Sequence, residues 1–259
     1  MLIVAWVLGI NPLALLSGDL GSGGYVDPQQ TSGVDPADSG SFASPQEEEL
    51  KEFVAVVLAD TEDTWHELLP AVGAQYREPK LVLFSGGADS ACGFAQSVVG
   101  PFYCPGDEKV YLDLDFFEEL SRRFRAPGDF AGAYVIAHEV GHHVQNALGI
   151  EEKVRQTRAG IGEAEANALS VRVELQADCF AGVWANHAHQ ERGLLEPGDI
   201  EEALTAASAV GDDMLQKQTT GRVVPDSFTH GTSAQRMHWF EAGYRSGNLT
   251  DCDTFSSNQ

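Results

Sequence analysis

The centre of the chain, residues 134–145, reads YVIAHEVGHHVQ. His138 and His142 are four positions apart, and residues at this spacing on a helix project from the same face, one turn apart. Both imidazoles are therefore expected to bind one zinc ion, which prefers a tetrahedral set of ligands. Glu139, beside the first histidine, is the candidate general base for a zinc-bound water. Apolar residues accompany this string and end before Gly149, a residue type that commonly follows a helix, so we predict a buried helix.

A second apolar helical stretch, expected from about Val171 to Ala188, carries Glu174 and Asp178 one turn apart. A catalytic zinc site has three protein ligands and one open position, so the third ligand must come from another part of the chain. We predict Glu174 as this ligand, with one zinc ion per chain. Asp178 is expected to accept the free ring N–H of a ligand histidine and so to fix its tautomer. The alternative is a solvated pair of carboxylates, but the apolar residues after Asp178 favour burial.

Four motifs in this chain resemble those of a known bacterial family. They are GPFYCPGDEKVYLD at residues 100–113, the string around His138, ELQADCFAGVW at 174–184, and FTHGTSAQR at 228–236. Glutamate and aspartate four residues apart are also typical of the gluzincins, the thermolysin-like superfamily. The motifs, in this order, resemble the "putative neutral zinc metallopeptidase" family, and the likeness spans about Gln46 to Phe255. The resemblance implies a membrane-tethered, extracytoplasmic zinc metalloendopeptidase that acts on a peptide or protein substrate.

Further residues near these motifs are candidates for supporting roles. By its order along the chain, His230 resembles the histidine that stabilises the oxyanion in thermolysin-like enzymes, so we name it as catalytic together with Glu139. A solvated or capping loop residue is the alternative for His230. His143 points about 100° away from its neighbour on the helix, and we interpret it as a supporting residue rather than a metal ligand. Tyr103 and Arg236 are weaker oxyanion candidates, for which structural roles are favoured.

The predicted fold class is α+β, a mostly helical zincin-like domain with a small antiparallel sheet and a metal site between two helices. A turn signal at residues 105–107 separates two strand-like runs and predicts a hairpin. We expect the edge of this hairpin to bind the peptide through backbone hydrogen bonds, with a purely structural hairpin as the alternative. Other expected elements are a helix from Pro45 to Leu69, a strand at 80–85, a short helix at 116–124 and a mostly helical region at 151–218.

The four cysteines, Cys92, Cys104, Cys179 and Cys252, do not show the paired close spacing of a zinc finger. We expect two disulfides. One would join Cys92 to Cys104 and hold the loop before the hairpin, which leaves Cys179 to pair with Cys252. The alternative is that all four are reduced, as in a cytosolic protein.

The overall composition excludes one class of partner. The chain has 259 residues, 43% of them hydrophobic, and its 16 basic and 39 acidic side chains give a formal net charge of −23. This length and apolar content suit one sizeable core. The negative charge repels nucleic acid, so we exclude a nucleic-acid role. No feature of the sequence indicates an oligomeric state.

The N-terminal segment divides into two parts before the metallopeptidase domain, residues 45–259. Residues 1–16 are almost wholly apolar, and we interpret them as the back end of a transmembrane anchor, with a cleaved signal peptide as the first alternative and a buried core helix as the second. Residues 17–44, rich in Gly, Ser, Asp and Pro, are expected to form a flexible linker. The expected location is therefore the cell membrane, through a single-pass anchor, with the domain periplasmic or external. Secretion is the alternative.

Two other functions remain open at this point. One is a membrane-tethered zinc protein that binds a partner without catalysis, and the other is an amidase acting on cell-wall peptides. An open coordination position favours catalysis, because structural zinc sites usually have four protein ligands. The motifs describe the metal site and not the specificity pocket, so they do not separate a peptidase from an amidase.

Overall fold

The computed structural model describes residues 45–96 and 100–256, so the expected anchor (1–16) and linker (17–44) lie outside the described residues. The strands are β1 Lys80–Phe84, β2 Gly87–Ser90, β3 Gly93–Gln96, β4 Phe102–Cys104 and β5 Lys109–Asp113. The α-helices are α3 Pro45–Ala71, α4 Leu114–Arg122, α5 Asp129–Ala147, α6 Ile150–Arg158, α7 Glu163–Gln190, α8 Asp199–Ala209, α9 Asp212–Thr220 and α10 Ser233–Ser246. Short 3-10 turns at Pro225–Ser227 and Leu249–Asp251 flank α10. None of the helices in the described part is both long and apolar enough to cross a membrane.

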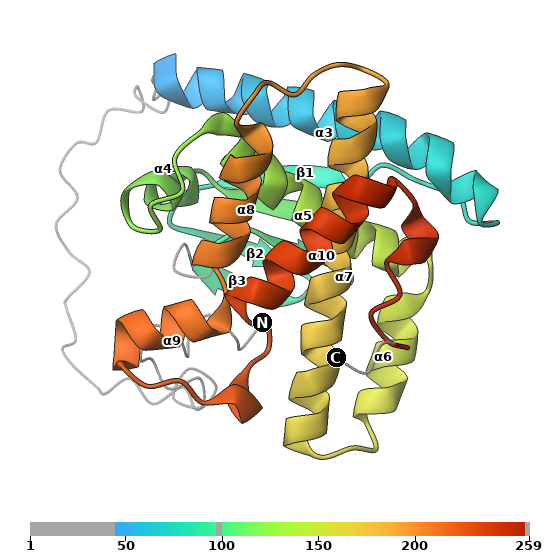
Figure 1. Cartoon of the computed structure of the whole chain (residues 1–259), viewed down its shortest axis with the longest axis vertical. Coiled ribbons are helices and arrows are strands. Elements are labelled where there is room, and N and C mark those ends of the chain that lie inside the picture. Colours follow the sequence, from blue (N-terminus) through green and yellow to red (C-terminus); the bar gives the residue numbers. More distant parts are fainter. Residues whose placement is uncertain (1–44, 97–99, 257–259) are drawn as a thin grey trace, which may run out of the picture.

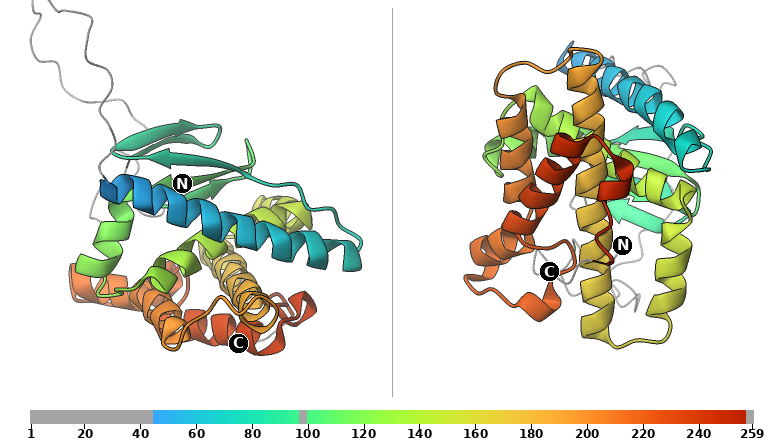
Figure 2. Two further views of the ribbon diagram at one scale, coloured as in Figure 1. Left: turned by 90° about the horizontal axis from the view of Figure 1, so that it is seen from above. Right: turned by 45° about the vertical axis from the view of Figure 1, so that its right-hand side comes forward.

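Helix α5 is the centre of the helical body. It contacts α3, α7 and α8 and also strands β4 and β5, and the left panel of Figure 2 shows the strands on one side of the helices. Nearly all of its residues are buried, including His138 and Glu139. The helix ends at Ala147, and Gly149 adopts a left-handed φ of 70°, as expected for a glycine after a helix C-terminus. Polar groups on a helix this deeply buried must find partners inside the protein.

The strands form one three-stranded sheet and one separate hairpin (Figure 1). The predicted hairpin is present as the antiparallel pair β4 and β5, with Tyr103 opposite Val110. The α+β class is confirmed, but the sheet is mixed because β1 pairs parallel to β5. The β2–β3 hairpin and β4 intervene between these two strands, so the chain returns to lie beside β1 in the same direction. The small sheet expected from the sequence is therefore present, with one antiparallel and one parallel strand pair.

The two disulfides have the pairing that was expected. Cys92, in the turn between β2 and β3, is bonded to Cys104 at the end of β4. Cys179 of α7 is bonded to Cys252, which follows the turn at Leu249–Asp251. One disulfide thus holds the edge strand β4, and the other holds the C-terminal segment against α7.

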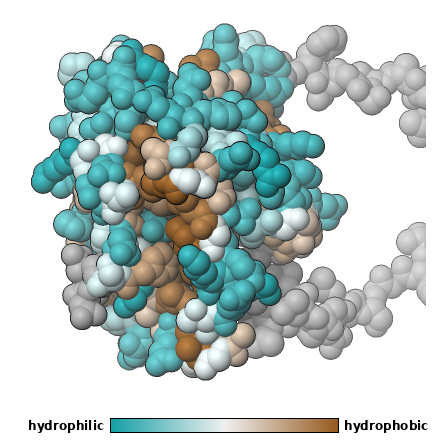
Figure 3. Space-filling view, turned by 90° about the vertical axis from the view of Figure 1, so that its right-hand side faces the viewer, coloured by the Kyte–Doolittle hydropathy of each residue, from teal (hydrophilic) through white to brown (hydrophobic). Residues whose placement is uncertain are grey.

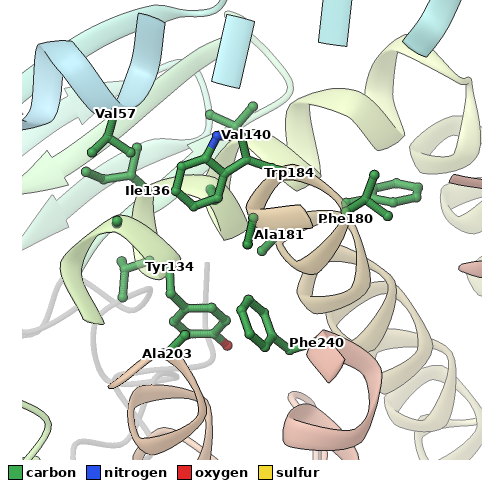
Figure 4. Packing of buried hydrophobic residues seen from close by; sticks show 14 of the residues in the cluster. Val57, Tyr134, Ile136, Val140, Phe180, Ala181, Trp184, Ala203 and Phe240 are labelled. Atoms are coloured by element: carbon green, nitrogen blue, oxygen red, sulfur yellow. The ribbon is translucent and has the colours of Figure 1, made fainter. Parts of the chain in front are cut away.

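The hydrophobic core lies where five helices meet. Figure 4 shows side chains from α3, α5, α7, α8 and α10 packed together, with the ring of Tyr134 facing that of Phe240. These two rings meet edge to face with centroids 5.5 Å apart, and Phe130 stacks on Trp184 at 5.6 Å. The outside is different, since the face in Figure 3 is mainly hydrophilic and its hydrophobic residues gather along a central depression.

Helices α7 and α10 approach each other at two glycines. A Cβ on Gly182 of α7 would collide with the carbonyl oxygen of Phe240 and would lie 2.7 Å from the amide nitrogen of Tyr244. A Cβ on Gly243 of α10 would collide in turn with the carbonyl oxygen of Cys179. The two backbones therefore touch, and no side chain fits between them.

We predict that Gly182→Ala lowers the free energy of unfolding by about 2 kcal/mol or more, because backbone atoms cannot rotate out of the way as a side chain can. Denaturant unfolding of the purified chain would measure the change. The control is Gly160→Ala, since a Cβ on Gly160 would have no neighbour within 4 Å. Equal stability of the two variants would contradict the described packing of α7 on α10.

Candidate metal centre

The three predicted ligands converge on one point between α5 and α7. His138 and His142 come from α5 and Glu174 comes from α7. The Nε2 atom of His138 is 3.2 Å from Oε2 of Glu174, and Nε2 of His142 is 3.7 Å from Oε1 of Glu174. One ligand atom from each residue lies within 4.8 Å of the others. The structure thus brings together the set of ligands expected from the sequence.

This arrangement fits a zinc ion. Tetrahedral zinc with the usual bond lengths to nitrogen and oxygen separates neighbouring ligand atoms by about 3.3 Å, close to the 3.2 and 3.7 Å found here. Two imidazoles and one carboxylate are also a usual ligand set of catalytic zinc. Burial opposes charge on His142, but Glu174 outweighs it and raises the pKa of His142 to about 10. The negative charge of the cluster therefore favours a cation.

Asp178 holds the first ligand histidine from behind. Its carboxylate is fully buried and accepts hydrogen bonds from Nδ1 of His138 at 2.9 Å and from the hydroxyl of Tyr134 at 2.5 Å. Burial opposes its ionisation, but Arg236 and His138 hold the pKa of Asp178 at about 2. Because an ionised carboxylate only accepts hydrogen bonds, Nδ1 of His138 carries the proton and Nε2 faces the cluster.

Arg236 is the counter-ion of Asp178. Its Nε and Nη2 atoms donate to the two carboxylate oxygens at 2.8 and 2.9 Å, and Nη2 also donates to Tyr134 at 3.1 Å. Only 4% of Arg236 is exposed. The guanidinium is therefore committed to a buried ion pair, which agrees with the structural role that the sequence favoured over oxyanion binding.

Glu139 lies next to the ligands and lines the same cleft. Only 7% of the residue is exposed, and burial raises the pKa of its carboxyl group, opposed by His138 and His142. The backbone of Tyr103, in strand β4, is near enough to this carboxylate to oppose the rise of its pKa. The candidate general base is thus placed between the ligand helix and the edge strand.

His143 faces away from the ligand cluster. Its Nε2 lies 2.6 Å from the carbonyl oxygen of Arg77, so Nε2 donates, and Nδ1 accepts from the hydroxyl of Tyr103 at 3.0 Å. The same hydroxyl accepts from Asn146 at 3.1 Å. His143 and Tyr103 therefore tie α5 to β4 and to the segment before β1, as expected for supporting residues.

His230 lines the cleft, and Asp212 fixes its orientation. The Asp212 carboxylate lies 3.1 Å from Nδ1 of His230 and accepts from the backbone N–H groups of Thr229, His230 and Gly231 at 2.7, 2.7 and 3.1 Å. Nδ1 must therefore donate, which leaves Nε2 available. The sequence did not single out Asp212. Its position in the first turn of α9 is an ordinary place for aspartate, so nothing linked it to a loop that is distant along the chain.

The cluster opens into a cleft of about 520 Å³. The cleft reaches α4, where Phe116 and Glu119 line it, and also α6, where Val154 and Arg158 line it. Helix α4 contacts the N-terminal half of α5, at Gly132. Helix α6 follows directly after the C-terminus of α5. The cleft therefore extends past the ligands in both directions along α5.

The described residues supply three ligands to the cluster and no fourth. All four cysteines are in disulfides, and His143 is occupied by Arg77 and Tyr103. Within residues 45–96 and 100–256, no further histidine, cysteine or carboxylate is grouped with the three ligands. A zinc ion held by these three residues would keep one tetrahedral position for solvent or substrate, as in a catalytic site.

Comparisons with known proteins agree with these observations. The model of a family described as "Putative neutral zinc metallopeptidase" matches residues 1–255. "Uncharacterized protein YpfJ" of Escherichia coli K12 is 58% identical over 212 residues, which cover 82% of this chain and 74% of that protein. "Uncharacterized protein Rv2575" of Mycobacterium tuberculosis H37Rv is 49% identical over 203 residues, which cover 74% of this chain and 66% of that protein. No solved structure matches the chain.

We predict that Arg236→Met lowers the free energy of unfolding by about 3 kcal/mol, because Asp178 would lose its buried counter-ion. Denaturant unfolding of the metal-free chain would measure this loss. Arg245→Met is the matched control on the same helix, because its ion pair with Glu241 is exposed and such pairs add little stability. A loss no greater than that of the control would show that Asp178 does not depend on Arg236.

Proposed function

Because the chain belongs to the family described as "Putative neutral zinc metallopeptidase", we propose that it is a zinc-dependent endopeptidase that hydrolyses peptide bonds. Family membership confirms the resemblance that the four motifs carried. The observation that carries the proposed activity is the convergence of His138, His142 and Glu174 on one point, with Glu139 buried beside them. A cleft that extends past this point in both directions suits a chain cut in its interior better than one trimmed at its end.

The side chains around the cluster have distinct roles in the proposed reaction. Zinc held by the three ligands would supply Lewis acidity, which polarises the scissile carbonyl and lowers the pKa of a water molecule. Glu139 accepts the proton of the attacking water and passes it to the leaving amine. His230, oriented by Asp212, donates from Nε2 in its imidazolium form, in which both ring nitrogens carry a proton, to the oxygen that becomes negative. Asp178 keeps His138 in the tautomer that presents Nε2.

Strand β4 is the proposed binding edge for the substrate backbone. In the described sheet the strand order β1-β5-β4 leaves β4 at one edge, and Phe102 and Tyr103 line the cleft. An extended peptide would add to this edge through backbone hydrogen bonds. The disulfide between Cys92 and Cys104 supports the role, because it holds the strand in place beside Glu139.

We further propose that the domain works outside the cytoplasm, in the periplasm or at the cell exterior. Two disulfides support this location, since such bonds form and persist in oxidising compartments. A single-pass anchor within residues 1–16 is the proposed link to the membrane, and secretion after cleavage of that segment is the alternative.

A non-catalytic zinc protein is the less favoured function. A structural zinc site usually has four protein ligands, whereas the described residues bring three together. A buried carboxylate next to the open position would also have no purpose in a structural site. Hydrolysis of a cell-wall peptide amide would use the same zinc ligands and the same general base. A cleavage assay that compares a protein substrate with a cell-wall peptide would distinguish the two activities.

We predict that Glu139→Gln lowers the turnover of casein by at least about 100-fold, the usual lower bound for a general base, while the chain still binds one zinc ion. Elemental analysis and a cleavage assay on the full chain and on the variant would measure both quantities. Normal cleavage by the Gln variant would refute the role of Glu139. Lack of zinc binding by the parent chain would refute the whole proposal.

Glu174→Ala is expected to weaken zinc binding by more than about 100-fold, a larger effect than the loss of a residue that only supports a ligand. Competition with a chromogenic chelator would measure the affinity. Glu165→Ala is the control, since Glu165 lies exposed in the first turn of the same helix. Similar affinities for the two variants would mean that Glu174 is not a ligand.

A further inference from the structure

The second ligand histidine is held differently from the first. Nδ1 of His142 lies 2.9 Å from Oε1 of Gln145, one turn later on α5. The side chain of Gln145 is fully buried. Its Nε2 lies 2.7 Å from the carbonyl oxygen of Val173 and 3.1 Å from Oε1 of Gln176. This amide therefore spans the gap between the two helices that carry the ligands.

The partners of Gln145 fix the direction of each hydrogen bond. The carbonyl oxygen of Val173 can only accept, so the amide nitrogen of Gln145 must face it. The amide oxygen of Gln145 then faces His142, and because an amide oxygen cannot donate, Nδ1 of His142 must carry the proton. Nε2 faces Glu174, 3.7 Å away, and is the nitrogen left to bind a metal once it has lost its proton, as a ligand binding through Nε2 requires.

The chain of hydrogen bonds continues to the C-terminal segment. Nε2 of Gln176 donates to the carbonyl oxygen of Cys252 at 2.9 Å, which turns Oε1 of Gln176 toward Gln145. Gln176 is 6% exposed and Cys252 is 1% exposed. The disulfide to Cys179 holds this acceptor against α7. Every bond from Cys252 back to His142 thus has one consistent direction, inside the protein.

An amide suits this position for an electrostatic reason. Three carboxylates already surround the two histidines, those of Glu139, Glu174 and Asp178. Glu139 and Asp178 are buried, and the side chain of Glu174 is 18% exposed. Among the described residues, Gln145 makes no hydrogen bond to an arginine or lysine, so a further buried carboxylate there would lack a counter-ion such as Arg236. A neutral amide accepts the hydrogen bond from Nδ1–H of His142 without adding charge.

We propose that Gln145 is a positioning residue that selects the Nδ1–H tautomer of His142, and that Gln176 and the backbone of Cys252 hold its amide in the required orientation. The inference rests on the proposed zinc site, since the tautomer matters only if His142 binds a metal through Nε2. Nothing in the sequence pattern marks Gln145, because its function depends on the partners that α7 brings to it.

The test compares the zinc affinities of Gln145→Leu and Gln145→Glu by chelator competition. Leucine fills similar space but accepts no hydrogen bond from His142. We therefore expect the zinc affinity to fall by about 10- to 100-fold, the usual effect of removing such a partner. Glutamate still accepts the hydrogen bond from His142, so the zinc affinity of Gln145→Glu should stay closer to that of the parent chain. If Gln145 only fills space, Gln145→Glu should have the lower zinc affinity of the two variants, because a buried charge disturbs the packing there more than an apolar side chain does.

Gln216→Leu is the matched control for the loss of a bridging amide. Gln216 also joins two partners, with Nε2 on Ser227 at 3.0 Å and Oε1 on the amide of Val224 at 2.8 Å, but it lies in α9 outside the ligand cluster. We expect its zinc affinity to equal that of the parent. An equal loss in Gln216→Leu and Gln145→Leu would overturn the specific role of Gln145.

Nitrogen-15 NMR reads the tautomer of His142 directly. In the zinc-loaded full chain, nitrogen-15 NMR should show a slowly exchanging Nδ1–H proton on His142, and this proton should lose its protection in Gln145→Leu. A His142 that is protonated at Nε2 instead would overturn the inference while leaving the zinc site intact. A parent chain that binds no zinc would overturn both the inference and the proposed function.

Discussion

The buried charge of Asp178 is the interaction on which the arrangement of the domain depends. A carboxylate without exposure to water must be surrounded by donors, and here they come from two other helices, as His138 and Tyr134 of α5 and Arg236 of α10. One side chain of α7 thereby fixes the relative positions of three helices. The first ligand histidine receives its orientation from the same carboxylate, so the stability of the fold and the geometry of the cluster have a common origin.

The parts of the site that repeat along a helix could be predicted from the sequence. His138 and His142, and likewise Glu174 and Asp178, are one helical turn apart, so local periodicity alone places each pair on one face. The cap of α10 is likewise a local feature, since Thr232 and Gln235 form a capping box. Of the two disulfides, the expected pairing of Cys92 with Cys104 leaves Cys179 to pair with Cys252 by elimination. For the two ligand pairs and the cap, the information lies within a few residues of the feature.

The parts that depend on contacts between distant segments could not be predicted. The parallel pairing of β1 with β5 requires the path of the intervening hairpin. Asp212 reaches His230 only because α9 begins beside the loop before α10. Gln145 is an ordinary helical residue until Val173 and Gln176 of α7 face it. These residues are chemically unremarkable in the sequence, and their roles arise from the tertiary structure.

The contact of α7 with α10 has a consequence for how such a site can vary. Glu174 lies on α7, and the loop of His230 leads directly into α10, so the separation of these two helices sets the width of the site. At Gly182 and Gly243 that separation is already the smallest that any amino acid allows. Substitution there can only widen the site and never narrow it. Divergence among related chains is thus constrained to one direction at these two positions, whereas the cleft walls on α4 and α6 are free to change in both.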